Sequence, residues 1–91
     1  AYVYYSTLII LRQMIIIIHM ITKKMGLKIK IERIKRNLTQ EQLAELADID
    51  RGTISKVERG IMSPTIATLE KIANAFKMKL QDLVNLEKID L

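Results

Sequence analysis

The sequence is poor in the residue types that build most catalytic and metal sites. It contains no cysteine, no tryptophan, one proline, one histidine and three glycines. The lack of cysteine excludes a disulfide framework, a thiolate metal site and a cysteine nucleophile. His19 lies in a run of isoleucine and methionine with no second histidine or carboxylate at ligand spacing, so we expect it to bind no metal. Paired carboxylates and a glycine-rich phosphate loop are also missing, so we expect neither an enzyme nor a cofactor.

Charge is unevenly distributed along the chain. Residues 1–22 contain a single charged side chain, Arg12, whereas the whole chain has 15 Lys and Arg against 10 Asp and Glu. The resulting net charge of +5 suits a phosphate-bearing partner such as nucleic acid. A chain of 91 residues makes one small domain with a modest core, which dimerisation would help to stabilise.

Composition divides the chain into three parts. Residues 1–24 form an appended apolar segment rich in isoleucine and tyrosine, 25–86 have the pattern of a helical domain, and 87–91 form a tail. The runs at 3–10 and 14–21 are β-branched or aromatic, which favours a β-hairpin, although the residues between them include no glycine, asparagine or aspartate.

Three other interpretations of the apolar segment stay open. A membrane-spanning helix from Tyr2 to Ile21 would be followed by Lys23 and Lys24, but Arg12 near its middle costs about 2.5–3.5 kcal/mol, and no small-residue cleavage site follows. The segment could also be a helix that packs on the globular part or on a partner, or it could lie outside the native coding sequence. We expect self-association through it, and no membrane partner.

The stretch from Leu38 to Gly60 predicts two short helices, 40–47 and 51–58, joined by a tight turn. Thr39 and Gln42 have the spacing of a capping box, and Asp48 and Asp50 suit a left-handed stop and a second N-cap. Leu43, Leu46, Ala47, Ile54 and Val57 are the expected inward positions. The outer face of the second helix is cationic and hydroxyl-rich, which suits the DNA major groove.

Apolar periodicity predicts the remaining helices. Leu27, Ile31, Ile34 and Leu38 form the expected buried stripe of a helix at 26–36, with Lys28 and Glu32 facing solvent and Asn37 as a left-handed stop. Thr65 should cap a fourth helix, and a short helix is expected at 80–86. The buried stripe of the fourth helix is expected to be Ile66, Leu69, Ile72, Ala73 and Phe76. The predicted fold is therefore all-α, with four to five helices.

Several stretches in register resemble the Cro and phage-repressor (XRE-type) helix-turn-helix domain. They are Arg33, LTQEQLA (38–44), DRGTISKVERG (50–60) and SPTIATLEKIANAF (63–76). The resemblance implies a compact lambda-repressor-like bundle. It also implies base readout by Arg51, Gly52, Thr53 and Lys56, with Gly52 allowing close approach. The implied phosphate contacts are Thr39, Gln40, Ser55 and Arg59.

The same resemblance implies a structural ion pair between Arg33 and Glu58. Lys77 and Lys79 depart from the family pattern, which usually has glycine and a small polar cap at these positions. Apolar residues near the C-terminus would form the dimer surface, or would complete the core of the monomer. These residues are Leu80, Leu83, Val84 and Leu86.

The expected function is that of a cytoplasmic, sequence-specific DNA-binding transcriptional regulator. A homodimer on a palindromic operator is expected, because two-fold pairing supplies both affinity and half-site spacing. Repressors and restriction–modification controllers have this organisation. The alternatives are an antitoxin, whose second partner would be a toxin protein, and a protein-binding module on the same fold. No small-molecule substrate is expected.

Overall fold

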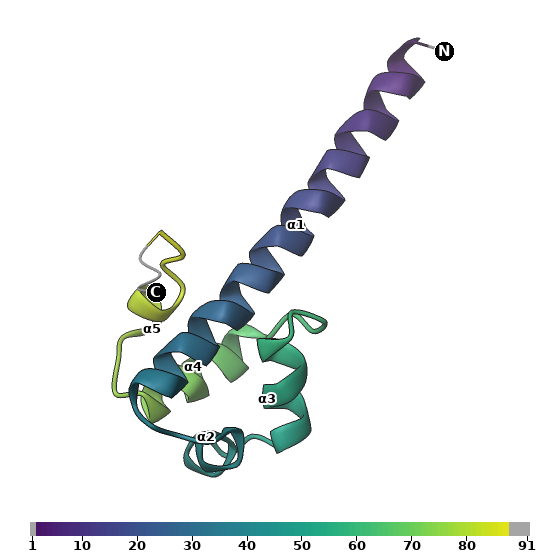
Figure 1. Cartoon of the computed structure of the whole chain (residues 1–91). Helices are drawn as coiled ribbons and strands as arrows, with labels where there is room; N and C mark the ends of the chain where they lie inside the picture. Colours follow the sequence, from purple (N-terminus) through teal and green to yellow (C-terminus); the bar gives the residue numbers. More distant parts are fainter. Residues whose placement is uncertain (1, 88–91) are drawn as a thin grey trace.

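The computed structural model describes residues 2–87, with side chains from Ser6 onward. These residues form a bundle of five helices and contain no strand. Four residues of the expected tail, 88–91, lie outside the described part. The helices are α1 (Tyr2–Lys35), α2 (Gln40–Ala47), α3 (Arg51–Glu58), α4 (Ile66–Ala75) and α5 (Leu80–Leu83) (Figure 1). The all-α prediction is confirmed.

The first helix is far longer than expected. α1 runs without a break through 34 residues, so the expected apolar segment and the start of the helical domain share one helix, and the β-hairpin interpretation is wrong. β-propensity is weak when no sheet surface is available for packing, and no turn residue interrupts the segment. Residues 6–21 are exposed, so they do not pack on the globular part either, and they project from it as a rod (Figure 1).

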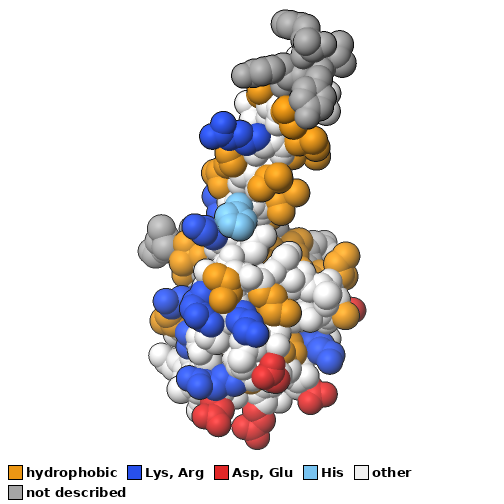
Figure 2. Space-filling view, turned by 90° about the vertical axis from the view of Figure 1, so that its right-hand side faces the viewer, with side chains coloured by type: hydrophobic (Ala, Val, Ile, Leu, Met, Phe, Trp, Pro, Cys, Tyr) orange, Lys and Arg blue, Asp and Glu red, His pale blue; other side chains and the backbone are white. Residues whose placement is uncertain are grey.

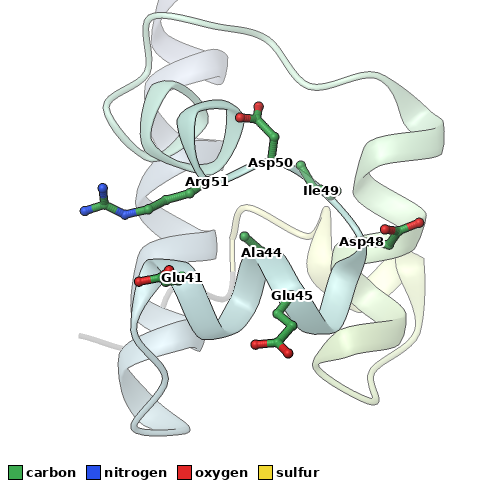
Figure 3. Close-up of a pocket in the computed structure, with 7 residues that line it drawn as sticks. All are labelled: Glu41, Ala44, Glu45, Asp48, Ile49, Asp50 and Arg51. Atoms are coloured by element: carbon green, nitrogen blue, oxygen red, sulfur yellow. The ribbon is translucent and has the colours of Figure 1, made fainter.

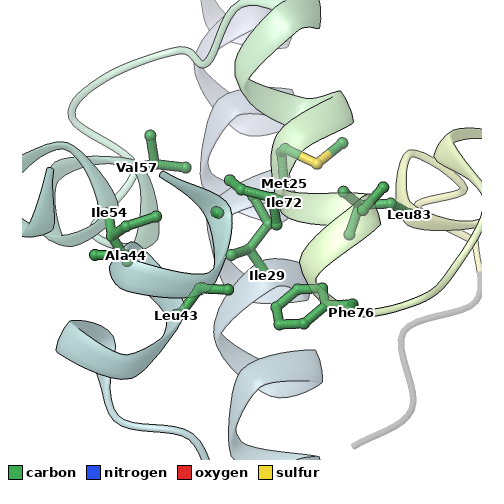
Figure 4. Packing of buried hydrophobic residues seen from close by; sticks show 11 residues of the cluster. Met25, Ile29, Leu43, Ala44, Ile54, Val57, Ile72, Phe76 and Leu83 are labelled. Atoms are coloured by element: carbon green, nitrogen blue, oxygen red, sulfur yellow. The ribbon is translucent and has the colours of Figure 1, made fainter. Parts of the chain in front are cut away.

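The core lies between the C-terminal third of α1 and the four shorter helices (Figure 4). Every helix contributes at least one side chain that is nearly inaccessible to solvent. Ile29 of α1, Leu43 of α2, Ile54 of α3, Ile72 of α4 and Leu83 of α5 are all 0% exposed. Because the five helices share one small core, its packing fixes the position of α3.

The buried stripe expected near the end of α1 is wrong at two of its four positions. Leu27 and Ile34 are 41% and 53% exposed, and Met25 and Ile29 are buried instead. Both sets have helical spacing, so periodicity alone does not choose between them. The buried set lies beside Gly26, where the backbone of α3 approaches closely, and this contact selects that side of the helix.

Two further inward predictions are wrong, at Leu46 and Ile66, which are 60% and 73% exposed. In α2 the buried residues are Leu43, Ala44 and Ala47. The small alanines allow neighbouring helices to approach that side, which turns Leu46 to solvent. Ile66 is the first residue of α4 and lies at the edge of the packed region, whereas Ile72, Ala73 and Phe76 are buried as expected.

Lys28 was expected to face solvent, but it is buried and joins α1 to α5. Its Nζ donates hydrogen bonds to the backbone oxygens of Asp82, at 2.8 Å, and Asn85, at 2.7 Å. A cation suits this position because the carbonyl groups at a helix C-terminus lack partners within the helix. Lys79 supplies no side-chain cap, and α5 ends at Leu83 instead of continuing to residue 86.

Glu32 does not face solvent as expected. Its side chain is 13% exposed, and its Oε2 lies 3.0 Å from Nη1 of Arg36 and 3.6 Å from Nζ of Lys35. The guanidinium of Arg36 also lies 4.7 Å from the centre of the Phe76 ring, an arrangement typical of a cation–π contact. Arg36 thus connects the end of α1 to the end of α4.

Candidate nucleic-acid interface

The turn between α2 and α3 is held by the local interactions that the sequence predicts. Oγ1 of Thr39 accepts from the backbone N–H of Gln42 at 3.0 Å, and Oε1 of Gln42 accepts from the backbone N–H of Thr39 at 2.8 Å. Asp48 then adopts the left-handed conformation, with φ 54° and ψ 48°, and ends α2. The capping box and the left-handed stop are therefore both confirmed, and they set the direction in which α3 leaves α2.

Asp50 caps α3 through its carboxylate. Oδ1 accepts from the backbone N–H of Gly52 at 3.2 Å, and Oδ2 accepts from the backbone N–H of Thr53 at 3.0 Å and from the Thr53 hydroxyl. The hydrogen bond from the Thr53 hydroxyl is the main reason that the pKa of Asp50 is lowered. The two backbone N–H donors and the nearby charge of Lys56 act in the same direction.

The lowered pKa of Asp50 predicts a defined loss of stability in acid. A carboxyl group with a lower pKa in the folded state stabilises the protein above its ordinary pKa of 3.8, and this contribution disappears as the pH falls through the folded value. Thermal unfolding followed from neutral pH to about pH 3 should therefore show the melting temperatures of the wild type and of Asp50→Ser converging in acid. Serine keeps an N-cap without a titrating carboxylate. Parallel curves for the two proteins would contradict the assignment.

The outward face of α3 is basic. Arg51, Lys56 and Arg59 are exposed, and Gly52 between them adds no side chain. Figure 2 looks onto this side of the globular part and shows basic side chains across it, with acidic ones gathered at the lower end. Thr53 and Ser55 are half-buried. The Thr53 hydroxyl donates to Asp50, so its oxygen and methyl group are what it offers to a ligand.

The expected phosphate contacts surround this face. Thr39 is exposed at the start of α2, where backbone N–H groups attract anions. Gln40 is half-buried, and its Nε2 donates to Oε1 of Glu58 at 3.2 Å, so its side chain is held against the end of α3. Nε of Arg59 donates to the backbone oxygen of Ser55 at 3.3 Å. Three of the predicted contact residues are thus anchored by hydrogen bonds within the protein, which limits their freedom before any ligand binds.

Arg33 and Glu58 form the ion pair that the resemblance implies, and the pair connects α1 to α3. Nε of Arg33 donates to Oε2 of Glu58 at 2.7 Å, and Nη2 donates to Oε1 at 2.9 Å. The third guanidinium nitrogen donates to the backbone oxygen of Leu38 at 2.7 Å. The two side chains are only 12% and 2% exposed. Glu58 therefore connects the basic helix to α1, and its carboxylate is shielded from solvent.

The expected dimer surface needs a correction. Leu83 is 0% exposed and belongs to the core of the monomer, because α5 packs that residue against the other helices. Leu80 and Leu86 are half-buried, and Val84 is exposed. Of the four expected residues, Leu80, Val84 and Leu86 remain available for contact with a second chain.

A hollow lies at the outside of the turn between α2 and α3 (Figure 3). The charged ends of its side chains point in different directions, so they do not converge on a bound small molecule. Four of its seven lining side chains are carboxylates, which makes it unsuitable for phosphate. Its lining residues are Glu41, Ala44, Glu45, Asp48, Ile49, Asp50 and Arg51.

Comparison with known proteins finds the same arrangement elsewhere. A family model described as helix-turn-helix matches residues 29–83. The chain is 38% identical over 64 residues to an immunity repressor protein of Bacillus phage phi105, an alignment that covers 70% of this chain and 44% of the repressor. It therefore spans less than half the length of that relative.

Two other relatives are matched over nearly their whole length. An HTH-type transcriptional regulator of Archaeoglobus fulgidus is 36% identical over 67 residues, which cover 74% of this chain and 94% of the regulator. The crystal structure of the restriction-modification controller protein C.AhdI from Aeromonas hydrophila superimposes with a TM-score of 0.67 at 31% identity, covering 68% of this chain and 94% of C.AhdI. Because the family model covers more than half of the chain and includes the capped turn and the basic helix, the chain belongs to the helix-turn-helix family of DNA-binding transcriptional regulators.

Proposed function

We propose that this chain is a sequence-specific regulator that binds a palindromic DNA operator as a homodimer. The observation that carries the proposal is the outward face of α3, where Arg51, Lys56 and Arg59 are exposed on a helix held in place by two caps and by the Arg33–Glu58 pair. A rigid basic helix of this kind fits the major groove. The proposed activity is binding alone, inside the cell, with no catalytic step.

The roles within the interface follow from side-chain chemistry. Arg51, in the first turn of α3, can donate two hydrogen bonds to one guanine, and the methyl group of Thr53 can contact thymine. Lys56, five residues after Arg51 in α3, is also exposed and can reach a base or a phosphate. The phosphate contacts are assigned to Thr39, Gln40, Ser55 and Arg59. They set the position and affinity of the protein, and the residues of the first turn set its sequence preference.

Dimerisation is part of the proposal because one module of this size buries little DNA surface. Val84 is the exposed apolar residue near α5, with Leu80 and Leu86 half-buried beside it. An immunity repressor protein and a restriction-modification controller protein are among the relatives of this chain. The similarity to a controller protein supports the proposal of a regulator.

Selection of bound sequences from random DNA duplexes, at a stated near-physiological salt concentration, tests the proposal. We expect an inverted repeat whose two half-sites are about one helical turn apart, 10–10.5 base pairs from centre to centre. Weak binding that depends steeply on salt and not on sequence would contradict it, because it would leave only the attraction between phosphates and basic residues. That outcome would favour the protein-binding alternatives, including a toxin partner.

Arg51→Ala tests the assignment of base readout. A bidentate arginine–guanine pair contributes about 1–3 kcal/mol of discrimination, so affinity for the selected operator should fall about 5- to 150-fold while affinity for random DNA changes far less. Lys71→Ala removes one exposed cation from α4, outside the helix-turn-helix, and serves as the control for net charge. Equal losses on operator and random DNA would show that Arg51 contacts phosphate instead.

A further inference from the structure

The half of α1 that projects from the globular part, residues 2–22, has no role in the proposed DNA interface. We call this segment the apolar arm. Its described large apolar side chains are each 47–65% exposed, and the part of the helix that is apolar enough to cross a membrane is 0% buried. A soluble monomer would hold this surface in water at a large cost in free energy. The apolar side chains of the arm therefore need a lipid phase or another protein molecule to shield them from water.

The distribution of apolar residues indicates which environment covers the arm. Leu8 to Leu11 and Met14 to Ile18 are uninterrupted apolar runs. Successive residues of an α-helix turn by about 100°, so each run extends around all sides of the helix. Contact with one partner helix would bury a single stripe of the arm and leave its other sides exposed to solvent. A helix that is apolar all round suits lipid, which covers every side equally.

The dimensions and the charges at one end of the arm agree with a bilayer. From Tyr2 to Thr22 the helix rises by about 30 Å, which matches the hydrocarbon thickness of a membrane. Lys23 and Lys24 follow directly and are exposed, as expected where a spanning helix meets anionic headgroups on the cytoplasmic side. We propose that the apolar arm spans a lipid bilayer and tethers the helix-turn-helix domain to the cytoplasmic face of the membrane.

The structure reduces the number of interpretations of the apolar segment that the sequence alone allows. It excludes the hairpin and a helix packed on the globular part, and the exposure of residues 6–21 distinguishes the arm from the buried central helix of a soluble protein. A cleaved export signal does not fit, because the arm continues directly into the helix that carries Met25 and Ile29 into the core. None of the residues assigned to DNA contact lies on the arm, so a tethered domain keeps its basic face.

Arg12 opposes insertion of the arm into a membrane, so its replacement tests the proposal directly. It is the one charged residue of the arm and lies near the middle, where its cost is comparable to the combined gain from nine isoleucines and leucines. Arg12→Leu should therefore raise the ratio of membrane-inserted to extracted full chain at least tenfold. Ile17→Asp should lower it at least tenfold, since it adds a second charge at similar depth. Position 17 is chosen because a carboxylate at position 16 would lie one helical turn from Arg12.

The experiment compares the full chain with Arg12→Leu, Ile17→Asp and Ile66→Asp. Ile66→Asp is the matched control, because it places the same charge on an isoleucine that is 73% exposed in the globular part. The two readouts are resistance to carbonate extraction from cell membranes and flotation with vesicles of phosphatidylethanolamine and phosphatidylglycerol. Circular dichroism confirms that each variant is folded, and DNA binding is not used as a readout.

Carbonate-resistant wild type and Ile66→Asp, with Ile17→Asp released, would support the tether. Soluble oligomers that Ile17→Asp disperses would overturn it and identify a second copy of the chain as the cover. A soluble chain whose state is unaffected by Ile17→Asp, or one extracted fully by carbonate, would also overturn it. These outcomes do not depend on whether the chain recognises a palindrome.

Discussion

Gly26→Ala is expected to destabilise the protein strongly, although alanine is the better helix former. A Cβ atom at position 26 would lie 2.1 Å from the backbone oxygen of Val57 and 3.0 Å from that of Glu58. Both atoms belong to the backbone of α3, so no side-chain rotation can relieve the contact, and α1 and α3 must separate. Overpacking typically costs about 1–3 kcal/mol, and we expect the upper end or beyond. The gain in helix propensity, about 1 kcal/mol, is too small to offset it.

Urea unfolding of Gly26→Ala and Gly52→Ala checks this expectation with a matched pair. A Cβ atom at Gly52 would meet only the exposed Asp50 side chain, with Oδ1 nearest at 3.3 Å, and a small shift of that side chain within its cap relieves the contact. Gly52→Ala should therefore change stability little, and it should weaken DNA binding if Gly52 allows close approach to the duplex. Similar unfolding midpoints for Gly26→Ala and the wild type would show that α1 and α3 can separate without cost.

Gly26 also explains why the sequence wrongly predicted Leu27 and Ile34 to be buried. Leu27 and Ile34 have helical spacing as good as that of Met25 and Ile29, and they belong to a longer apolar stripe. The choice between them depends on where α3 can approach the helix backbone, and this is a property of the tertiary structure. A glycine inside a helix is a weak signal of such an approach, but it was available in the sequence.

Lys28 could not be predicted for a similar reason. Lysine is almost never buried without a partner, so the sequence favours an exposed position. Its partners are backbone oxygens of Asp82 and Asn85, more than 50 residues away, and they become acceptors only because α5 ends there. No local pattern encodes this contact.

The caps were predictable because each depends on residues within one turn of chain. Thr39 with Gln42, Asp48, and Asp50 all form the interactions that their identities favour, whatever the rest of the fold does. The residues assigned to DNA contact have no such local signature. Their assignment depends on the resemblance of the whole motif, and the structure adds that Arg51 and Lys56 are exposed on a helix fixed at both ends.

Glu58→Ala should come close to unfolding the domain at room temperature. It would leave the guanidinium of Arg33, only 12% exposed, without its two charged acceptor contacts, and removal of one partner from a buried pair costs about 3–5 kcal/mol. Small domains have a total stability of about 5–15 kcal/mol, and a core of this size places the chain toward the lower end. Thermal unfolding followed by circular dichroism measures the effect. Lys56→Ala, an exposed residue on the same helix, should change the melting temperature far less, and equal small effects would refute a structural role for the pair.

The double variant Arg33→Met/Glu58→Met separates stability from positioning. Replacing both charges with apolar side chains leaves no charge unpaired, so stability should recover to near that of the wild type. The variant would nevertheless lose the hydrogen bonds to Leu38 and Gln40, which join the ion pair to the chain before α2 and to its first turn. If the pair holds α3 at a fixed angle to α2, the folded double variant should bind operator DNA more weakly than the wild type. Full affinity in a stable double variant would show that packing of Ile54 and Val57 alone positions the recognition helix.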